Sequence, residues 1–335
     1  MSQASSNDDS QSIKPEVVPL DPFWLNRWQS LDDLINSAVQ EIPAKGEFSH
    51  FRSILKALQS FGRNHFFYFF LGLGGKMEEG KNPLLKANKE CCFARQKWFN
   101  DFSSDITKSP LEVNPEHPPN YVLRMIIDQI SMDFESIQRA CYQRMYGSDR
   151  QKSTLLLADK WGTEILDRFV MKENDKRGLE DNALVITYFD HATKINICPY
   201  TNIALIGIPF TATAKDDYRD LLLLPHELGH YVYHMAKMGN QSLKQYIESK
   251  LEETPSSSEE ALKLVLSWSE ELFCDVFGLF TSREPGVVAT ALSMVADNHP
   301  HHAFLDDGTY PIDALRLWIY IKTIEHIQTK LNEAS

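Results

Sequence analysis

Two histidines and a glutamate stand together in residues 226–230, which read His-Glu-Leu-Gly-His. On a helix, residues four apart share one face and lie about 6 Å apart along the axis, so both imidazoles can reach one metal ion. Glu227 lies about 100° around the helix from His226, where its carboxylate can hold a water molecule on that ion. The spacing therefore predicts two ligands and a general base for zinc-dependent hydrolysis.

A catalytic zinc ion usually has three protein ligands and one position left for water, so a third ligand must come from elsewhere. His234 lies about 12 Å beyond His226 on the same helix, too far to share the ion, and we expect it to be a surface or packing residue. Glu271 and Asp275 are in i, i+4 relation on a second predicted amphipathic helix. One of these carboxylates can bind the metal while the other supports a histidine.

The pattern His226-Glu227-x-x-His230 followed by Glu271-x-x-x-Asp275 resembles that of the gluzincin metallopeptidases, whose familiar member is thermolysin. The match is to motifs over roughly the last 130 to 150 residues. The resemblance implies that His226, His230 and Glu271 bind Zn²⁺. It also implies that Glu227 activates the water and that Asp275 hydrogen-bonds a ligand histidine.

Two neighbours of Glu271 are alternative ligands. Glu270 offers a second carboxylate directly before it, and Cys274 offers a softer thiolate three residues later. The Glu-x-x-x-Asp register favours Glu271, but the sequence leaves both alternatives open.

A further element, Tyr310-Pro-Ile-Asp-Ala-Leu-Arg316, is similar to one that follows the third ligand in some gluzincin families. By that resemblance Tyr310 stabilises the oxyanion and Arg316 braces the carboxylates of the site. The alternative is structural, with Pro311 in the first turn of the last helix and Arg316 on the surface.

Three β-prone segments precede the histidine motif. Residues 184–189 and 194–198 flank the sequence Asp-His-Ala-Thr and predict a β-hairpin, whereas residues 203–208 form a continuous apolar run that predicts a buried strand. The gluzincin resemblance implies a small sheet beside the histidine helix, with one strand edge able to pair with an extended peptide.

The rest of the chain is predicted to be helical, which gives an α+β, predominantly helical fold class. We expect a disordered tail at residues 1–16, a helical domain at 17–178 and a zincin-like metallopeptidase domain at 179–335. The helical domain is indicated by apolar stripes with a period near 3.6 residues. The first stripe comprises Trp24, Trp28, Leu31, Ile35 and Ile42.

Composition narrows the partners and the compartment. The net charge of −12 argues against general nucleic-acid binding and against anionic membrane surfaces. The five cysteines have no Cys-x-x-Cys spacing, which favours a reducing compartment, and no apolar segment follows a basic start as in a secretory signal. We therefore expect a cytoplasmic protein with no cofactor other than Zn²⁺ and with a protein or peptide as substrate.

The sequence as a whole predicts a zinc metallopeptidase, an endopeptidase rather than an exopeptidase, selective for an intracellular protein. The alternative is a non-catalytic zincin-like adaptor that binds a partner through its helical domain. Glu227 argues against the adaptor, because a purely structural zinc site has no use for a general base.

Overall fold

The chain is mostly helical and carries two small three-stranded sheets, which confirms the predicted α+β, predominantly helical class. The computed structural model describes residues 22–72, 119–172, 175–198, 200–213, 219–254, 258–282, 311 and 313–334. The helices are α1 (Pro22–Glu41), α2 (Ser49–Gly72), α4 (Pro119–Tyr146), α5 (Asp149–Asp167), η2 (Phe210–Thr213), η3 (Arg219–Leu223), α6 (Leu224–Met235), α7 (Leu243–Glu253), α8 (Glu259–Ser282) and α10 (Asp313–Ala334). The strands are β1 (Arg177–Gly178), β2 (Leu184–Asp190), β3 (Lys194–Cys198), β4 (Ile203–Pro209), β5 (Lys237–Met238) and β6 (Gln241–Ser242).

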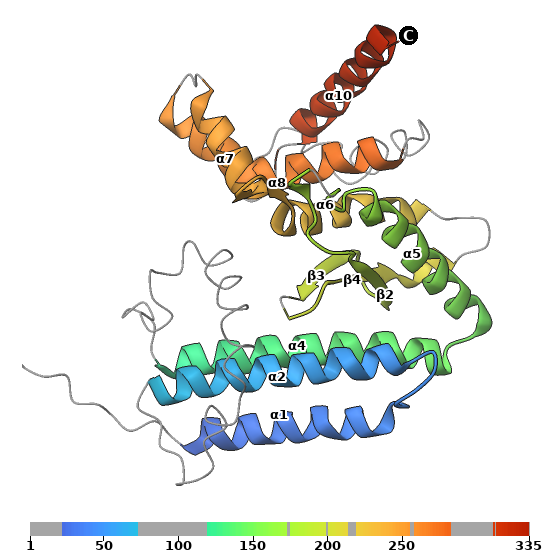
Figure 1. Cartoon of the computed structure of the whole chain (residues 1–335), viewed down its shortest axis with the longest axis vertical. Helices are drawn as coiled ribbons and strands as arrows, with labels where there is room; N and C mark the ends of the chain where they lie inside the picture. The colour runs from blue at the N-terminus through green and yellow to red at the C-terminus, as the bar shows by residue number, and fades with distance from the viewer. Residues whose placement is uncertain are drawn as a thin grey trace, which may run out of the picture.

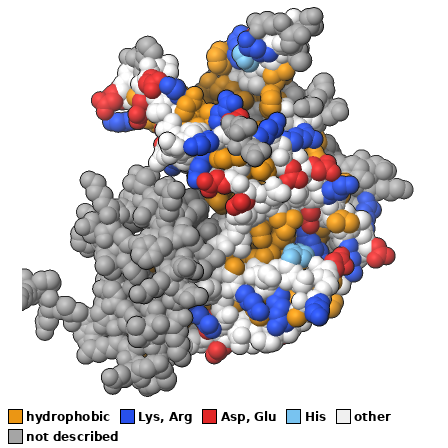
Figure 2. Space-filling view, viewed as in Figure 1, with side chains coloured by type: hydrophobic (Ala, Val, Ile, Leu, Met, Phe, Trp, Pro, Cys, Tyr) orange, Lys and Arg blue, Asp and Glu red, His pale blue; other side chains and the backbone are white. Residues whose placement is uncertain are grey.

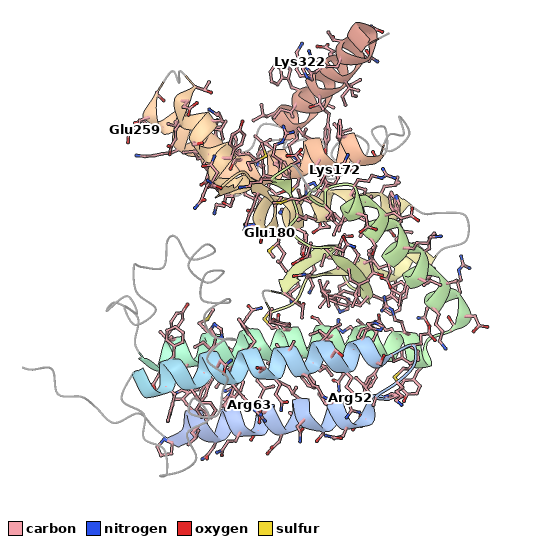
Figure 3. The ribbon with its side chains drawn as sticks, viewed as in Figure 1. Arg52, Arg63, Lys172, Glu180, Glu259 and Lys322 are labelled. Carbon is pink, nitrogen blue, oxygen red and sulfur yellow. The ribbon has the colours of Figure 1, made fainter. Side chains whose placement is uncertain are left out.

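Helices α1, α2 and α4 pack side by side as one layer of the molecule (Figure 1). The predicted stripe on α1 is buried from Trp28 onward, and the Trp28 ring stacks on Phe66 of α2 with centroids 5.0 Å apart. At the edge of the same contact, Arg63 of α2 donates two hydrogen bonds to Asp32 of α1 (Figure 3). An apolar stripe with a charged border is the pattern expected of a helix that faces a core.

The sheet β2-β4-β3 lies between this helical layer and α5 and α6 (Figure 1). Alternate residues point to opposite faces of a strand. In β4, Ile203 and Leu205 belong to the core shared with α1, α2 and α4, whereas Ala204, Ile206 and Ile208 belong to the core shared with α5 and α6. Burial of both faces explains why this strand is a continuous apolar run.

The predicted hairpin of residues 184–198 is wrong. β2 and β3 do not pair with each other, because β4 lies between them, parallel to β2 and antiparallel to β3. The short connection from β2 to β3 crosses over β4 at Gly207, where an added Cβ would lie 3.2 Å from Cβ of Asp190 and 3.3 Å from the carbonyl oxygen of Ala192. The absence of a side chain at 207 leaves room for this crossing.

A mostly buried ion pair joins α4, α5 and β2. Arg144 of α4 donates to a carboxylate oxygen of Asp159 of α5 at 2.5 Å and to the carbonyl oxygen of Thr187 in β2 at 2.8 Å. The other oxygen of Asp159 accepts from the backbone nitrogen and the hydroxyl of Thr187, at 2.6 and 2.8 Å. Burial raises the pKa of Asp159, although Arg144 and Thr187 oppose the shift.

The predicted division into two domains at residues 178 and 179 is not tested by these contacts and stays a prediction. α5 lies before that boundary, yet its side chains Leu155, Ala158 and Ile165 belong to the core cluster shared with β4 and α6.

Two surface properties bear on partners. Acidic and basic side chains are interspersed over the described part of the face in Figure 2. Among the helices that the structure describes, none combines the length and the apolar character needed to cross a membrane.

The ion pair of α4 and α5 generates a stability prediction. Arg144→Met leaves the Asp159 carboxylate buried without its counter-ion, so we expect the free energy of unfolding at pH 7 to fall by about 3–5 kcal/mol. The loss of Arg144 raises the folded-state pKa of Asp159 further, so protonation of Asp159 stabilises the folded state relative to the unfolded state. The deficit should therefore shrink as the pH falls through this raised pKa towards the unfolded value near 4.

Urea unfolding at several pH values measures this deficit. The double variant Arg144→Met with Asp159→Leu removes both charges and should recover part of the loss at pH 7. A deficit for Arg144→Met that is the same at every pH would show that the Asp159 charge is not its source.

Candidate metal centre

The histidine motif lies on α6, which follows the 3₁₀ turn η3 and has Pro225 in its first turn. Proline is suited to this position because the first helical N–H groups have no partner within the helix. Leu224, Leu228 and Val232 are buried in the core that α6 shares with the sheet and α5. His226 and His230 are only partly buried and face α8, with their ring centroids 5.2 Å apart.

Glu271 of α8 meets both histidines. Nε2 of His226 lies 3.4 Å from Oε2 of Glu271, and Nε2 of His230 lies 3.7 Å from Oε1 of the same carboxylate. One ligand atom from each of the three residues lies within 4.8 Å of the others. Ligand atoms around a tetrahedral ion with bonds of about 2.1 Å are about 3.4 Å apart, so these separations fit one small divalent cation.

The opposite ring nitrogen of each histidine is held by another carboxylate of α8. Nδ1 of His226 lies 3.1 Å from Oδ1 of Asp275, and Nδ1 of His230 lies 2.7 Å from Oε1 of Glu270. A carboxylate at Nδ1 favours a proton on that nitrogen, and Nε2 of each ring is directed at Glu271. In its neutral form each imidazole would therefore bind a metal through Nε2.

Asp275 of α8 is fully buried and accepts hydrogen bonds from two other helices. In addition to His226 of α6, Arg316 of α10 donates from Nε and Nη2 at 2.8 and 2.7 Å, and Tyr320 of α10 donates from its hydroxyl at 2.8 Å. Burial alone would raise the pKa of Asp275, but the hydrogen bonds from His226 and Arg316 outweigh it and hold the pKa at about 2. The aspartate therefore remains ionised and fixes the orientation of the His226 ring.

Glu270 links two histidines rather than pointing at the metal position. Its Oε1 lies 2.7 Å from Nδ1 of His230 and 2.9 Å from Nε2 of His234. Burial opposes ionisation, but these two imidazoles lower the pKa of Glu270 well below its usual range. Glu270, an alternative ligand by sequence, thus supports His230, and His234 extends that support by one more turn of α6.

The pKa shifts of His226 and Glu227 show how negative the centre of the site is. Burial lowers the pKa of His226, but hydrogen bonds to Asp275 and Glu271 raise it to about 9. Burial raises the pKa of Glu227, against the attraction of His226 and His230, and Glu271 raises it further. A bound cation would relieve the repulsion among these carboxylates.

Glu227 lies between the histidines and the sheet. It interacts electrostatically with both imidazoles and accepts a hydrogen bond from the backbone of Ile195 in β3. β3 is at the edge of its sheet and packs next to α6. The predicted base therefore lies beside the ligand cluster, on the side that a strand edge borders.

The glycine within the motif allows α6 and α8 to approach each other. A Cβ at Gly229 would lie 2.8 Å from Cα and 3.1 Å from Sγ of Cys274, which is closer than carbon atoms pack. Cys274 is fully buried in this contact and is not among the ligand atoms that cluster in the described residues. Its predicted alternative role as a ligand therefore has no geometric support.

The structure assembles most of the predicted site and adds three residues to it. His226, His230 and Glu271 converge, Asp275 supports His226, and Arg316 braces Asp275. Tyr310, the predicted oxyanion stabiliser, lies outside the described residues. Sequence reasoning missed the roles of Glu270, His234 and Tyr320.

Comparison of the chain with protein-family models, with curated proteins and with solved structures gave no match. The resemblance to gluzincins therefore stays a prediction that rests on motifs.

The close approach of α6 and α8 generates a prediction with an internal control. Gly229→Ala gains helix propensity but forces the backbones apart, so we expect a net loss of about 1–3 kcal/mol in the free energy of unfolding. Gly278→Ala gains the same propensity, and its Cβ would be 3.4 Å from the backbone nitrogen of His226, an ordinary contact. It should be neutral or stabilising by up to about 1 kcal/mol. Equal effects of the two substitutions in chemical unfolding would contradict the packing argument.

Proposed function

We propose that this protein is a zinc-dependent metallopeptidase of the gluzincin type. The observation that supports it best is the convergence of both Nε2 atoms and the Glu271 carboxylate at separations of 3.4 and 3.7 Å. Two imidazoles and one carboxylate are the ligand set of catalytic zinc in thermolysin and carboxypeptidase A. Three protein ligands leave a coordination position for water or substrate.

The residues around the cluster fit a catalytic zinc ion. Each histidine has a carboxylate on its remaining nitrogen, the arrangement that strengthens an imidazole as a ligand. Nitrogen and oxygen ligands without a thiolate suit a hydrolytic zinc ion. When bound, Zn²⁺ supplies a Lewis acid that polarises the scissile carbonyl and acidifies a water molecule.

In this mechanism Glu227 is the general base. Its carboxylate lies beside the two histidines and accepts a proton from the attacking water. It then donates that proton to the amine of the leaving peptide. Asp275 and Glu270 keep the histidine rings in place during this transfer, and Arg316 keeps Asp275 in place.

The substrate is proposed to be an extended peptide that lies along β3. One edge of β3 pairs with β4 and the strand ends the sheet order β2-β4-β3, so its other edge has no partner among the described strands of that sheet. An extended peptide can add to such an edge through its backbone. Pairing here would place a peptide bond near Glu227, which contacts the backbone of Ile195. Tyr310 remains the proposed oxyanion donor, and an intracellular protein remains the proposed substrate of this endopeptidase.

Metal binding is the first test. We expect purified protein to bind one zinc ion per chain, measured by elemental analysis and competition with a chelator. Glu271→Gln should nearly abolish binding, whereas Glu270→Gln should weaken it about 10- to 100-fold because it loosens His230. Glu260→Gln changes an exposed carboxylate at the start of the same helix and is the matched control. Equal zinc affinity in all four proteins would contradict the proposed centre.

Peptide cleavage is the second test. Glu227→Gln is isosteric and leaves all three ligands intact, so the zinc content should be unchanged. Loss of the base should lower kcat/KM for a peptide library at least about 100-fold. In cells, new protein N-termini that appear with wild type but not with Glu227→Gln would identify the substrate. If both proteins bind zinc and neither cleaves any peptide, the adaptor hypothesis is favoured over the peptidase.

A further inference from the structure

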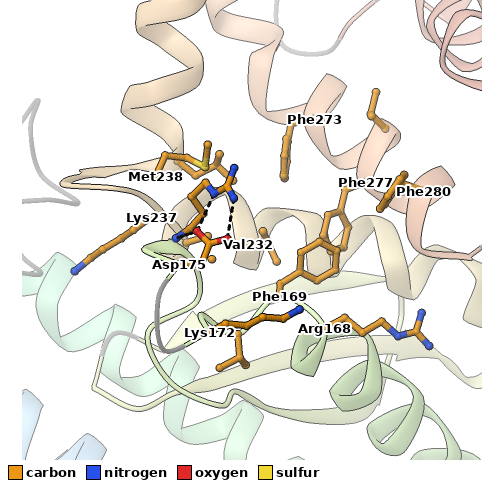
Figure 4. A pocket seen from close by; sticks show the side chains of 16 residues that line it. Arg168, Phe169, Lys172, Asp175, Val232, Lys237, Met238, Phe273, Phe277 and Phe280 are labelled. Atoms are coloured by element: carbon orange, nitrogen blue, oxygen red, sulfur yellow. Dashed lines mark hydrogen bonds and ion pairs between the residues drawn. The ribbon is translucent and has the colours of Figure 1, made fainter. Parts of the chain in front are cut away.

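A cavity of about 470 Å³ lies beside α6 and α8, and Figure 4 shows the side chains that line it. None of them belongs to the ligand cluster. Its apolar side is formed by four phenylalanine rings, one from the segment that follows α5 and three from α8. These are Phe169, Phe273, Phe277 and Phe280. The Phe169 and Phe277 rings are in contact, with centroids 4.8 Å apart. The volume is within the range of pockets that hold small molecules, about 300–1,000 Å³.

The other side of the cavity is held in place by the small sheet β1-β5-β6. Arg177 and Gly178 pair with Met238 and Lys237, and the nitrogen of Leu179 donates to the carbonyl oxygen of Phe169 at 2.7 Å. Gly178 has a φ of +126°, and a Cβ there would lie 2.1 Å from the carbonyl oxygen of Phe169. The backbone around the cavity is therefore fixed by hydrogen bonds and by the conformation at position 178, which requires a glycine.

The charges around the cavity are opposite in sign to those of the whole chain. Four cationic side chains line it (Arg168, Lys172, Arg177 and Lys237) against one carboxylate, Asp175, whereas the chain has a net charge of −12. Asp175 accepts two hydrogen bonds from the guanidinium of Arg177, drawn as dashed lines in Figure 4, and Lys237 pairs with Glu180.

Two of these cations remain available for an anion. Among the described residues, no hydrogen bond or salt bridge engages the side chains of Arg168 and Lys172, although Lys172 attracts the nearby Asp175 carboxylate, and both side chains are exposed at the rim. An apolar cavity whose rim offers two such cations is complementary to a molecule with an apolar body and an anionic head.

The cavity is on the opposite side of the α6–α8 pair from the ligand cluster. At 3.6 residues per turn, Val232 in the cavity wall lies about 140° around α6 from the midpoint of His226 and His230. Phe273 lies about 180° around α8 from the midpoint of Glu271 and Asp275. A molecule in this cavity is therefore not a substrate at the ligand cluster.

We propose that this cavity is a second binding site, for a medium-chain aliphatic carboxylate. The chain would lie against the phenylalanine rings and the carboxylate would lie between Arg168 and Lys172. This site is independent of the proposed peptidase function, because none of the cavity residues belongs to the ligand cluster.

Isothermal titration with octanoate and with octanol at low ionic strength tests the proposal. We expect octanoate to bind at one site per chain and at least about fivefold more tightly than octanol, because only the acid can pair with the rim cations. The double variant Arg168→Gln with Lys172→Gln should reduce octanoate affinity by about the same factor and leave octanol unchanged. Lys263→Gln removes an exposed cation of α8 outside the cavity and should have no effect.

A second variant separates this cavity from other sites. Val276→Phe places a ring in the cavity wall and should abolish binding of both molecules, while zinc binding, which uses a face of α8 about 120° away, is retained. Octanoate binding that survives Val276→Phe would be binding elsewhere, such as at the zinc ion, and would overturn the proposal. Equal affinity for octanoate and octanol, or octanoate affinity unchanged in the double rim variant, would overturn it as well.

Discussion

The contact between α6 and α8 at Gly229 and Cys274 is the constraint on which the ligand cluster depends. The two histidines are on one helix and Glu271 is on the other, so the separation of the helices sets the distances between their ligand atoms. The metal–ligand distances of a formed centre vary by only about 0.2 Å, so the helices must hold their ligands closely in place. Because a Cβ at Gly229 would meet the backbone of Cys274, the helices hold this separation only with glycine at that position. The glycine is thus as necessary to the geometry as the ligands are.

Asp275 adds an electrostatic constraint to this packing. A buried carboxylate is costly unless donors replace its water, and here His226, Arg316 and Tyr320 do so. Since these donors come from α6 and α10, the aspartate joins three helices while it orients one ligand ring. The same group therefore contributes to the fold and to the site, and loss of any one donor would change the hydrogen bonds that the other donors make.

The parts of the site that the sequence predicts are those fixed within one helix. The i, i+4 spacing of His226 and His230 determines their common face, and the register with Asp275 distinguishes Glu271 from Glu270. The pairing of Glu270 with His230 and His234 depends on how α8 is rotated against α6, which no local pattern contains.

The sheet and the last helix differ in how much of their structure local patterns in the sequence indicate. The hairpin prediction failed because it was based on the short connection between β2 and β3. The position of β4 between them depends on pairing with residues later in the chain, and Gly207, where the connection crosses β4, is a local sign of it. The contact of Tyr320 has a signal in the sequence. It lies four residues after Arg316 on the same helix face, so any carboxylate that Arg316 reaches is within reach of Tyr320.

The two faces of the α6–α8 pair have different chemistry, but the geometry of both depends on how the same two helices are packed. One face carries the proposed zinc centre and the other forms the wall of the proposed carboxylate site. The helices cannot move closer, because Gly229 already has no room for another heavy atom beside Cys274. A ligand that displaces α8 would therefore change the distance between Glu271 and the histidines. By linkage, such a ligand would change the zinc affinity by the same factor by which zinc changes its own, so the two sites are coupled to the extent that either ligand moves α8.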